Sequence, residues 1–284
     1  MAKAKVAVVV DSTANIPPDL VQQYHIHVIP QTVNWEDKSY LEDVTITAEE
    51  FYTRLPASKV NPTTSQPSAG EFYEFFSKVA ETAESIVAIH ISEYLSGTLS
   101  SARTAVEMMG GYPMEIVDSR SASMGLGLIT LAAARAAAAG QDYQSVAALA
   151  RSLVPKTRVV FVVDTLEYLH RGGRIGGAKR LIGSMLSVKP LLHLADGRIE
   201  PMASVRTKKK AVQHMLDTVQ QDMGGKSNIH LAVLHAAAAE EAAALAATLR
   251  SALQPVELAI GGIGPVIGTH VGPGTLGVAY YSES

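Results

Sequence analysis

The chain has 284 residues, of which 47% are hydrophobic and 18% charged, and its net charge is −3. This composition supports a substantial core and excludes a disordered chain, and the absence of a long run of one charge argues against nucleic-acid binding. The chain contains no cysteine, which excludes disulfides, thiolate metal sites and a cysteine nucleophile.

The N-terminus places lysines before an apolar run that ends at Asp11. That run is too short for the apolar core of a signal peptide. No apolar segment reaches the length of a membrane span, because charged and amide residues interrupt the alanine-rich stretches. We therefore expect a soluble, cytoplasmic chain with no integral membrane segment.

In the first half of the chain, short apolar runs alternate with amphipathic stretches. Such alternation is typical of a doubly wound parallel sheet. The apolar runs consist mostly of β-branched residues, which favours strands buried on both faces. Strands are predicted at 6–10, 27–33, 86–91 and 114–117, and helices begin near residues 16, 47, 68, 98, 121 and 142.

The segment 86–109 combines a strand, a hydroxyl-rich loop and an amphipathic helix. Open α/β sheets bind ligands at the carboxyl ends of strands, and a new helix begins with unpaired N–H groups. Ser96, Gly97 and Thr98 therefore predict an anion seat made of two hydroxyls, a glycine that permits close approach, and free amides. The alternative is an ordinary helix cap that binds nothing. Similar hydroxyl-rich loops are expected elsewhere in the chain, including residues 61–68, and they favour the seat.

The second half predicts a second α/β domain from about residue 156. The dipeptide Asp196-Gly197 between two apolar runs indicates a hairpin, so this sheet is expected to be mixed or antiparallel. The predicted domains are therefore 1–155, a Rossmann-like domain, and 156–284. Strands are predicted at 159–163, 190–195, 198–203, 229–234, 256–260 and 278–281, and helices at 165–170, 181–186, 207–223 and 237–253.

Two glycine-rich segments resemble nucleotide-binding loops but lack the required surroundings. The segment 262–268 contains a proline and has no long helix after it, whereas a dinucleotide site needs a complete βαβ unit. The segment 172–179 ends in Gly-Ala-Lys, which excludes a kinase phosphate loop in this chain. Only His25 and His27 are close in sequence, which disfavours a metal site. No cofactor is expected.

A hydrolase is the alternative enzymatic interpretation. Ser96 could meet His270, which would give a serine-dependent lipid esterase or thioesterase. However, Tyr94 occupies the position where a nucleophile elbow needs glycine, and no acidic residue is an evident partner for the histidine. In the simpler interpretation, Ser96 only donates hydrogen bonds. The remaining possibility is a protein that binds an anion with an apolar tail.

The chain resembles the DegV family, which comprises the fatty-acid-binding subunits of bacterial fatty acid kinase systems. The resemblance extends from Val6 to about Tyr281. Each motif is weak by itself, but their joint order is specific. The motifs, in chain order, are Asp11-Ser12-Thr13, Thr64-Ser65-Gln66-Pro67-Ser68, Leu95-Ser96-Gly97-Thr98, Asp118-Ser119, Arg171-Gly172-Gly173-Arg174-Ile175, Val205-Arg206-Thr207-Lys208 and His270-x-Gly272-Pro273-Gly274.

The resemblance implies a two-domain α/β protein that buries a long-chain fatty acid, with the second domain covering the acyl chain. It implies no catalysis by this chain: a separate ATP-dependent fatty acid kinase phosphorylates the presented carboxylate, and the acyl phosphate feeds phospholipid synthesis. The residues that it assigns to the carboxylate are Thr64, Ser96, Gly97, Arg174 and His270. Those that would shape the seat are Asp11, Ser12, Ser65, Thr98 and Asp118, and those that would meet the kinase are Arg206, Lys208 and Lys209.

Simple energetics indicate how much the acyl tail and the carboxylate seat would each contribute to binding. A palmitate tail has about 14 methylenes, and burying each contributes roughly 0.8 kcal/mol, so burial contributes roughly 11 kcal/mol in total. Each hydrogen bond at the seat contributes on the order of 1 kcal/mol. The tail would therefore supply most of the affinity, and the seat would set the orientation of the ligand.

Structural alternatives stay open: His270 could be a core histidine, Arg174 could bind helix carbonyls, and the basic cluster could be a solvated face. We expect a monomer.

Overall fold

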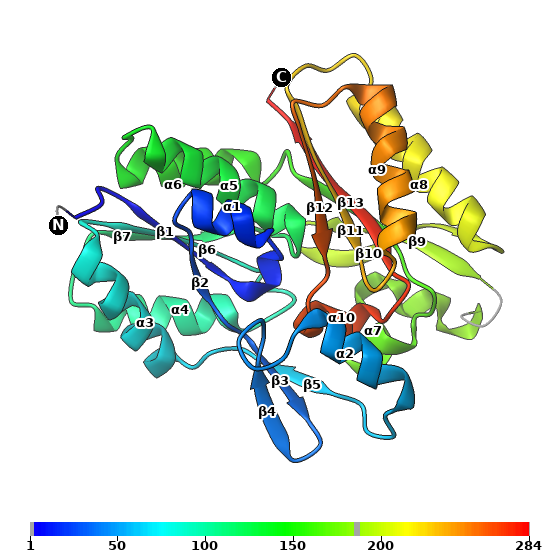
Figure 1. Ribbon diagram of the computed structural model, residues 1–284, viewed down its shortest axis with the longest axis horizontal. Helices are drawn as coiled ribbons and strands as arrows, with labels where there is room; N and C mark the ends of the chain where they lie inside the picture. The colour runs from blue at the N-terminus through cyan, green and yellow to red at the C-terminus, as the bar shows by residue number, and fades with distance from the viewer. Residues whose placement is uncertain (1–2, 185–187, 284) are drawn as a thin grey trace.

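The computed structural model describes residues 3–184 and 188–283 and contains a parallel four-stranded sheet near its N-terminus (Figure 1). The strand order is β2-β1-β6-β7, and every pair is parallel. This sheet confirms the predicted α/β class for the first half. The strands are β1 (Ala7–Asp11), β2 (His27–Ile29), β6 (Ile86–His90) and β7 (Met114–Asp118).

Helices cover both faces of this first sheet (Figure 1). Because side chains alternate along a strand, Val8 and Val10 of β1 join the cluster under α5, whereas Ala7 and Val9 pack on the opposite side against Phe72 of α3. One face carries α1 (Pro18–Gln23), α5 (Met124–Ala138) and α6 (Tyr143–Leu153), and the other α3 (Ala69–Thr82) and α4 (Thr98–Met108).

The second sheet has six strands in the order β10-β9-β8-β13-β11-β12 and is mixed, as predicted. The predicted hairpin is present, with positive φ angles of 47° at Asp196 and 81° at Gly197. The strands are β8 (Arg158–Val162), β9 (Lys189–Ala195), β10 (Arg198–Val205), β11 (Ile229–His235), β12 (Glu257–Gly262) and β13 (Leu276–Ser282).

The two faces of the second sheet have different neighbours. Val160 and Val162 of β8 pack under α8 (Lys208–Met223) and α9 (Ala239–Leu253). Val159 and Phe161 alternate with them and face the first domain. One face of this sheet is therefore closed by its own helices, and the other is available to line a site between the domains.

A third, antiparallel sheet of order β4-β3-β5 corrects two predictions. The strand expected at 27–33 is two strands, because the chain leaves the parallel sheet at Pro30 and Gln31. The segment 63–65, expected as a loop, is the edge strand β5. The strands are β3 (Thr32–Trp35), β4 (Lys38–Leu41) and β5 (Thr63–Ser65), with η1 (Ser12–Ala14), α2 (Ala48–Arg54) and η2 (Leu55–Ala57) nearby in sequence.

The third sheet and α2 form a small lobe with its own hydrophobic core. Trp35 lies edge-on to Phe51, and the Arg54 guanidinium lies 4.4 Å from the centroid of the Trp35 ring. This core also includes Val266 of the C-terminal segment, which is distant in sequence. The lobe therefore connects the first domain to the C-terminal segment.

Short helices near the site were the least predictable elements. The helix α10 (Pro265–Val271) forms in a glycine-rich segment where the sequence analysis predicted no helix; Pro265 occupies its first turn, and a small N-cap, Gly264, precedes it. The predicted helix at 165–170 is α7 (Glu167–Arg171). The helix expected at 181–186 overlaps the 3-10 helix η3 (Gly176–Ser184), and its last two residues lie outside the described residues.

The two domains share their largest buried cluster. It contains Val8 and Ile89 from the first sheet and Phe161 and Leu234 from the second. The helix α5 packs against strands of both sheets. We propose that the domains divide between α6 and β8, where the sequence predicted a boundary at residue 155. Among the described helices, none combines the length and apolar character that a membrane crossing requires.

Candidate functional site

A cavity lies between the two sheets and α10, with about 850 Å³ of space including its open mouth. Its lining divides into two kinds of side chain. The apolar part comes mainly from strands and α10: Ile91, Leu95, Ala122, Val159, Phe161, Leu169, Leu194, Ile199, Leu234, Ile263, Val266, Ile267 and Val271. The polar part comes mainly from loops and strand ends: Thr13, Gln31, Thr64, Ser65, Gln66, Ser96, Ser123, Arg174, His270 and Thr275.

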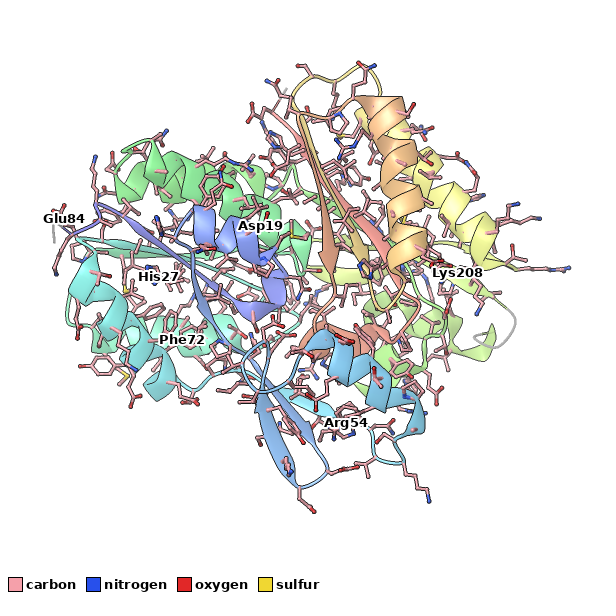
Figure 2. The ribbon with its side chains drawn as sticks, viewed as in Figure 1. Asp19, His27, Arg54, Phe72, Glu84 and Lys208 are labelled. Atoms are coloured by element: carbon pink, nitrogen blue, oxygen red, sulfur yellow. The ribbon has the colours of Figure 1, made fainter. Side chains whose placement is uncertain are left out.

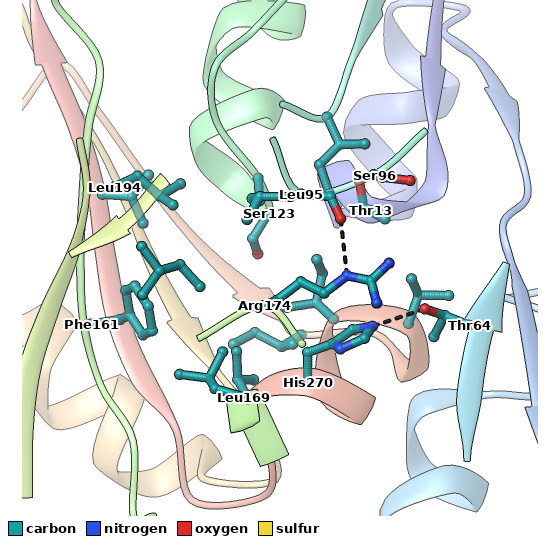
Figure 3. A pocket seen from close by; sticks show the side chains of 18 of the residues that line it. Thr13, Thr64, Leu95, Ser96, Ser123, Phe161, Leu169, Arg174, Leu194 and His270 are labelled. Atoms are coloured by element: carbon teal, nitrogen blue, oxygen red, sulfur yellow. Dashed lines mark hydrogen bonds between the residues drawn. The ribbon is translucent and has the colours of Figure 1, made fainter. Parts of the chain in front are cut away.

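Most labelled side chains of the two kinds lie on opposite sides of the cavity, with Ser123 between them and Leu95 beside Arg174 (Figure 3). Figure 3 shows Phe161 and Leu194 on one side of the cavity and Ser96, Thr64 and His270 on the other. The cavity therefore has an apolar end and a polar end, which suits an elongated ligand with one polar terminus.

At the polar end, Ser96 terminates a chain of hydrogen bonds. The Gln31 side-chain amide donates to Thr98 Oγ1 at 2.7 Å, and Thr98 Oγ1 lies 2.8 Å from Ser96 Oγ. Since Thr98 Oγ1 accepts from Gln31, we assign its own proton to the bond with Ser96. Ser96 Oγ also accepts the Thr98 N–H at 3.3 Å. The Ser96 hydroxyl proton is therefore left to donate into the cavity.

A second chain ends at Thr64. His270 Nε2 lies 2.8 Å from Thr64 Oγ1 (Figure 3), whereas His270 Nδ1 is buried without a partner. Because an orphaned buried N–H is rarer than an orphaned lone pair, we assign the proton to Nε2. His270 then donates to Thr64, whose hydroxyl proton can also donate into the cavity. A side chain on Gly172 would place its Cβ 2.1 Å from Nδ1, so only glycine fits beside this ring.

Burial and the nearby positive charge of Arg174 lower the pKa of His270 to about 4. The ring is therefore neutral at physiological pH, which agrees with the single-donor role of Nε2. An imidazolium would need an anionic partner, and within the described residues His270 forms no ion pair with a carboxylate. The charge at this end of the cavity comes from arginine instead.

Arg174 enters the polar end from the segment after α7. Its Nε donates to the Leu95 carbonyl at 3.1 Å (Figure 3), and its Nη1 donates to the Gly172 carbonyl at 2.6 Å. No described carboxylate forms an ion pair with this guanidinium. Arg174 thus binds carbonyl groups near a helix end, as the predicted alternative stated. Its positive charge nevertheless has no carboxylate partner beside the cavity within the described residues. Such a charge favours an anionic group in the polar end.

The structure brings Thr64, Ser96, Arg174 and His270 together at one end of one cavity, although they are far apart in sequence. Gly97, which was predicted to contact the ligand, is the N-cap of α4 and is not among the lining residues. The absence of a side chain on Gly97 makes room for Gln66, since a Cβ on Gly97 would lie 2.8 Å from Gln66 Nε2.

The residues expected to shape the seat have different positions. Ser65 lines the cavity, and Thr98 is fully buried behind Ser96. Ser12 Oγ accepts the Gln31 backbone N–H at 2.9 Å, which places it one step behind the cavity. Asp118 lies outside the lining and accepts the Arg120 N–H at 2.9 Å; burial raises its pKa.

Asp11 is fully buried below Ile91, which begins the hydroxyl-rich loop. Its Oδ2 accepts the Ile91 N–H at 3.0 Å and lies 3.1 Å from His90 Nδ1. Burial alone raises the pKa of Asp11, but the bonds from His90, Thr13 and Ile91 outweigh burial and hold this pKa below its usual value. Asp11 therefore fixes the start of the loop that carries Ser96.

Sequence reasoning did not single out Gln31 or Glu42, and it quoted Gln66 within a motif without giving it a role. Gln31 and Gln66 are polar residues next to proline, a weak signal that many surface turns share. Glu42 is 1% exposed, and burial raises its pKa to about 8. Its position in a short acidic loop gave no indication of burial.

The basic residues predicted to meet a partner lie apart from the polar end. Arg206 and Lys209 are exposed, whereas Lys208 forms ion pairs with Glu241 at 3.3 Å and Asp164 at 3.6 Å. Lys208 begins α8, which covers the face of the second sheet opposite the cavity (Figure 2).

The geometry does not support the hydrolase alternative. No hydrogen bond joins Ser96 to His270, whose Nε2 is bonded to Thr64. A catalytic triad also needs an acid at Nδ1, and this atom has no partner. Across the described residues, no group of three histidine, aspartate or glutamate side chains could hold a metal ion.

The chain is similar to proteins of one family along its whole length. A sequence profile described as "Uncharacterised protein, DegV family" matches residues 5–283. A DegV domain-containing protein of Clostridium perfringens is 39% identical over 283 residues, which cover 98% of this chain and 99% of that one.

Solved structures give the same result. A structure described as the fatty acid binding of a DegV family protein from Thermus thermophilus has a TM-score of 0.92 and 35% identity, and covers 98% of this chain and 99% of that chain. The crystal structure of DegV from Bacillus subtilis, described as a fatty acid binding protein, has a TM-score of 0.92 and 33% identity, with 99% and 100% covered.

Proposed function

The chain belongs to the DegV family, and from this premise we propose that it binds a long-chain fatty acid in the cavity, with the carboxylate at the polar end. The observation that carries the proposal is the separation of the lining into an apolar end and a polar end that holds an uncompensated arginine. The similar proteins from Thermus thermophilus and Bacillus subtilis are both described as binding fatty acid.

In this proposal the carboxylate accepts hydrogen bonds from Ser96 and Thr64 and lies beside Arg174. All three groups are donors at that end, which favours the ionised acid over an ester or an alcohol. The polar groups behind them, Thr98 and His270, set the direction of the two hydroxyl protons. Chain length and unsaturation would be decided by the apolar end.

We further propose that the protein presents this carboxylate to a separate ATP-dependent fatty acid kinase. An open hollow adjoins the polar end and shares Thr64, Arg174 and His270 with it, so a partner could approach the carboxylate from outside. The chain's own segment 172–179 lacks the phosphate-loop sequence, so phosphoryl transfer would take place in the partner. The product would be an acyl phosphate for phospholipid synthesis. We also propose that the protein acts as a monomer in the cytoplasm.

Mass spectrometry of an organic extract from the purified protein tests the ligand. About one fatty acid per chain, seen also by native mass spectrometry, is the expected result. A clean extract, together with no uptake of added palmitate or oleate, would contradict the proposal.

The same preparation tests the esterase alternative. The proposal expects no hydrolysis of nitrophenyl acyl esters above a buffer control. A hydrolysis rate that Ser96→Ala abolishes would instead make Ser96 a nucleophile and overturn the binding-protein role.

The docking role of Arg206, Lys208 and Lys209 is a separate proposal that rests on the family resemblance. Arg206→Glu should leave palmitate affinity unchanged and slow acyl-phosphate formation with the kinase, most strongly at low salt, because a rim charge mainly sets the association rate. Lys226→Glu, a charge reversal beyond the end of α8, is the control. Equal rates for both variants across ionic strengths would exclude Arg206 from docking.

A further inference from the structure

Glu42 is a buried acid that joins the two domains behind the polar end of the cavity. Its Oε1 accepts the backbone N–H of Val266 at 2.8 Å, in the first turn of α10. Its Oε2 shares a hydrogen bond with Ser12 Oγ, next to the end of β1. The side chain is 1% exposed and is not part of the cavity lining. Glu42 therefore contacts both domains without being placed to touch the ligand.

On the side of the first domain, a series of hydrogen bonds connects Glu42 to Ser96. Ser12 Oγ accepts the Gln31 backbone N–H at 2.9 Å, and the Gln31 side chain donates to Thr98 Oγ1 at 2.7 Å. Thr98 is the residue that orients the Ser96 hydroxyl. These bonds form an unbroken path from the Glu42 carboxyl group to one wall of the polar end.

On the side of the second domain, Glu42 is connected to Thr64 through α10. Val266 and His270 are one turn apart on α10, so a group that holds the Val266 N–H also fixes the position of the His270 ring. His270 Nε2 then bonds Thr64 at 2.8 Å. The second path thus ends at the opposite wall of the same polar end.

A glycine keeps space for this arrangement. A Cβ on Gly264, the N-cap of α10, would lie 2.4 Å from Glu42 Oε1 and 2.9 Å from Asn15 Nδ2. The φ angle of Gly264 is −69°, which any residue can adopt. Glycine is therefore needed at this position for the space that it leaves to Glu42 and not for its backbone freedom.

We propose that Glu42 is a positioning residue whose carboxyl group, by holding Ser12 and α10 together, sets the separation of the Ser96 and Thr64 hydroxyls. The inference rests on the proposed function, in which these two hydroxyls bind one carboxylate. Two oxygens of one carboxylate are a fixed distance apart, so both donors are satisfied only if the two walls keep their spacing.

The charge state of Glu42 supports this role. Burial raises its pKa to about 8, and the negative charges of Asp43 and Asp11 act in the same direction. Tyr52 of α2 is the other titratable group that interacts with Glu42, and the only titratable residue on α10, His270, bonds Thr64 instead. Glu42 is thus mostly protonated at neutral pH and ionises above about pH 8, where its negative charge would oppose a ligand carboxylate.

The first experiment measures palmitate affinity at pH 7 and pH 9 for the wild type, Glu42→Ala, Glu42→Gln and the control Asp37→Asn, which alters an exposed acid in the turn between β3 and β4. Glu42→Ala should weaken palmitate binding at pH 7 by about tenfold or more. It leaves the buried Val266 N–H unpaired, so α10 and the Thr64 hydroxyl lose their position. Glu42→Gln keeps both bonds and cannot ionise, so it should bind like the wild type at pH 7 and lose less affinity at pH 9. A Glu42→Ala affinity within twofold of Asp37→Asn, or equal alkaline losses in Glu42→Gln and wild type, would overturn the proposal.

A second pair of variants leaves Glu42 in place and removes its space. Gly264→Ala should weaken palmitate binding by about tenfold, since Glu42 must leave Val266. Gly262→Ala is the matched control, because a Cβ there meets no atom within 4 Å. Equal affinities for these two variants would also overturn the proposal.

A ligand-independent measurement separates this inference from the proposed function. The ring-nitrogen NMR signals of His270 should move in Glu42→Ala and Gly264→Ala and stay in place in Asp37→Asn and Gly262→Ala. If the wild type binds no fatty acid, the proposed function fails, and the His270 signals still decide whether Glu42 positions α10. Unmoved signals in both test variants would refute the positioning role.

Discussion

The apolar and polar ends of the cavity are built by different means. The apolar end is lined largely by strands, where alternation directs every second side chain inward, as at Val159 and Phe161 of β8. The polar end is assembled from loops, a three-residue edge strand and a seven-residue helix, and its donors are aligned by hydrogen bonds from buried residues.

This difference separates affinity from orientation. Burial of a methylene contributes roughly 0.8 kcal/mol wherever it occurs along the tail, so the apolar end should bind in proportion to chain length. The polar end offers a few directional donors that are worth roughly 1 kcal/mol each and cannot grow with the ligand. Variants at the two ends should therefore differ in how their effect depends on acyl length.

The largest effect is expected from blocking the apolar end with Leu194→Trp, at a position far from Ser96 (Figure 3). Excluding about four methylenes costs about 3 kcal/mol, so palmitate affinity should fall roughly 200-fold. Decanoate should lose less than threefold, because its tail is shorter. Calorimetry with both acids, with the exposed Met202→Trp as control, measures this contrast. Equal losses for the two acids would remove the distinction between the ends.

The second effect is a pH dependence of stability at the polar end. The pKa of His270 is about 4 in the folded protein and about 6.5 in an unfolded chain, so between these values the unfolded state binds the extra proton. Stability is therefore lost as pH falls from 6.5 to 4, by about 3 kcal/mol from this residue.

Urea unfolding of the wild type and His270→Gln at pH 7 and pH 4.5 measures that loss. The variant should lose less stability on acidification than the wild type. His230→Gln changes a histidine that is paired with Glu257 at 2.9 Å and serves as the control. Parallel losses in the wild type and His270→Gln would show that His270 titrates normally.

A smaller effect is expected from removing the charge at the polar end. Arg174→Gln should weaken binding about 30-fold, because hydrogen bonds to charged groups contribute about 1.5–3 kcal/mol. The factor should be the same for palmitate and decanoate. Arg171→Gln, an exposed neighbour that is ion-paired with Glu167, should change affinity less than twofold. A loss for Arg174→Gln that grows with acyl length would assign Arg174 to the tail.

The smallest effect is expected from Ser96→Ala. Loss of one neutral hydroxyl donor should weaken binding about fivefold, again independently of acyl length. Ser100→Ala, on the exposed side of α4, is the matched control and should bind like the wild type. Affinity of Ser96→Ala within the error of that control would mean that the Ser96 proton does not reach the ligand.

Much of the fold could be predicted because its signals are local. Continuous apolar runs that alternate with amphipathic stretches predicted the parallel first sheet, and Asp196-Gly197 predicted the hairpin of the mixed second sheet. Several candidate residues were also identifiable, since hydroxyls and glycines after strands mark the ligand side of an open sheet. Their motifs, taken in order, carried the family resemblance.

The remaining features depend on contacts between distant segments. The sequence alone does not show that the chain changes sheets at Pro30 and Gln31 or that 63–65 pairs with β3, because such pairing is decided by the partner strand. The helix α10 is short and glycine-rich, so its tertiary contacts stabilise it more than its own propensity does.

By itself, the sequence determined the longer strands and helices of both sheets and which of these strand ends carry hydroxyl groups, because these properties follow from neighbouring residues. Only the tertiary structure placed Thr64, Ser96, Arg174 and His270 at one end of one cavity and buried Glu42 between the domains. Burial and hydrogen bonding across more than 200 positions, as between Glu42 and Val266, depend on packing that no local pattern records.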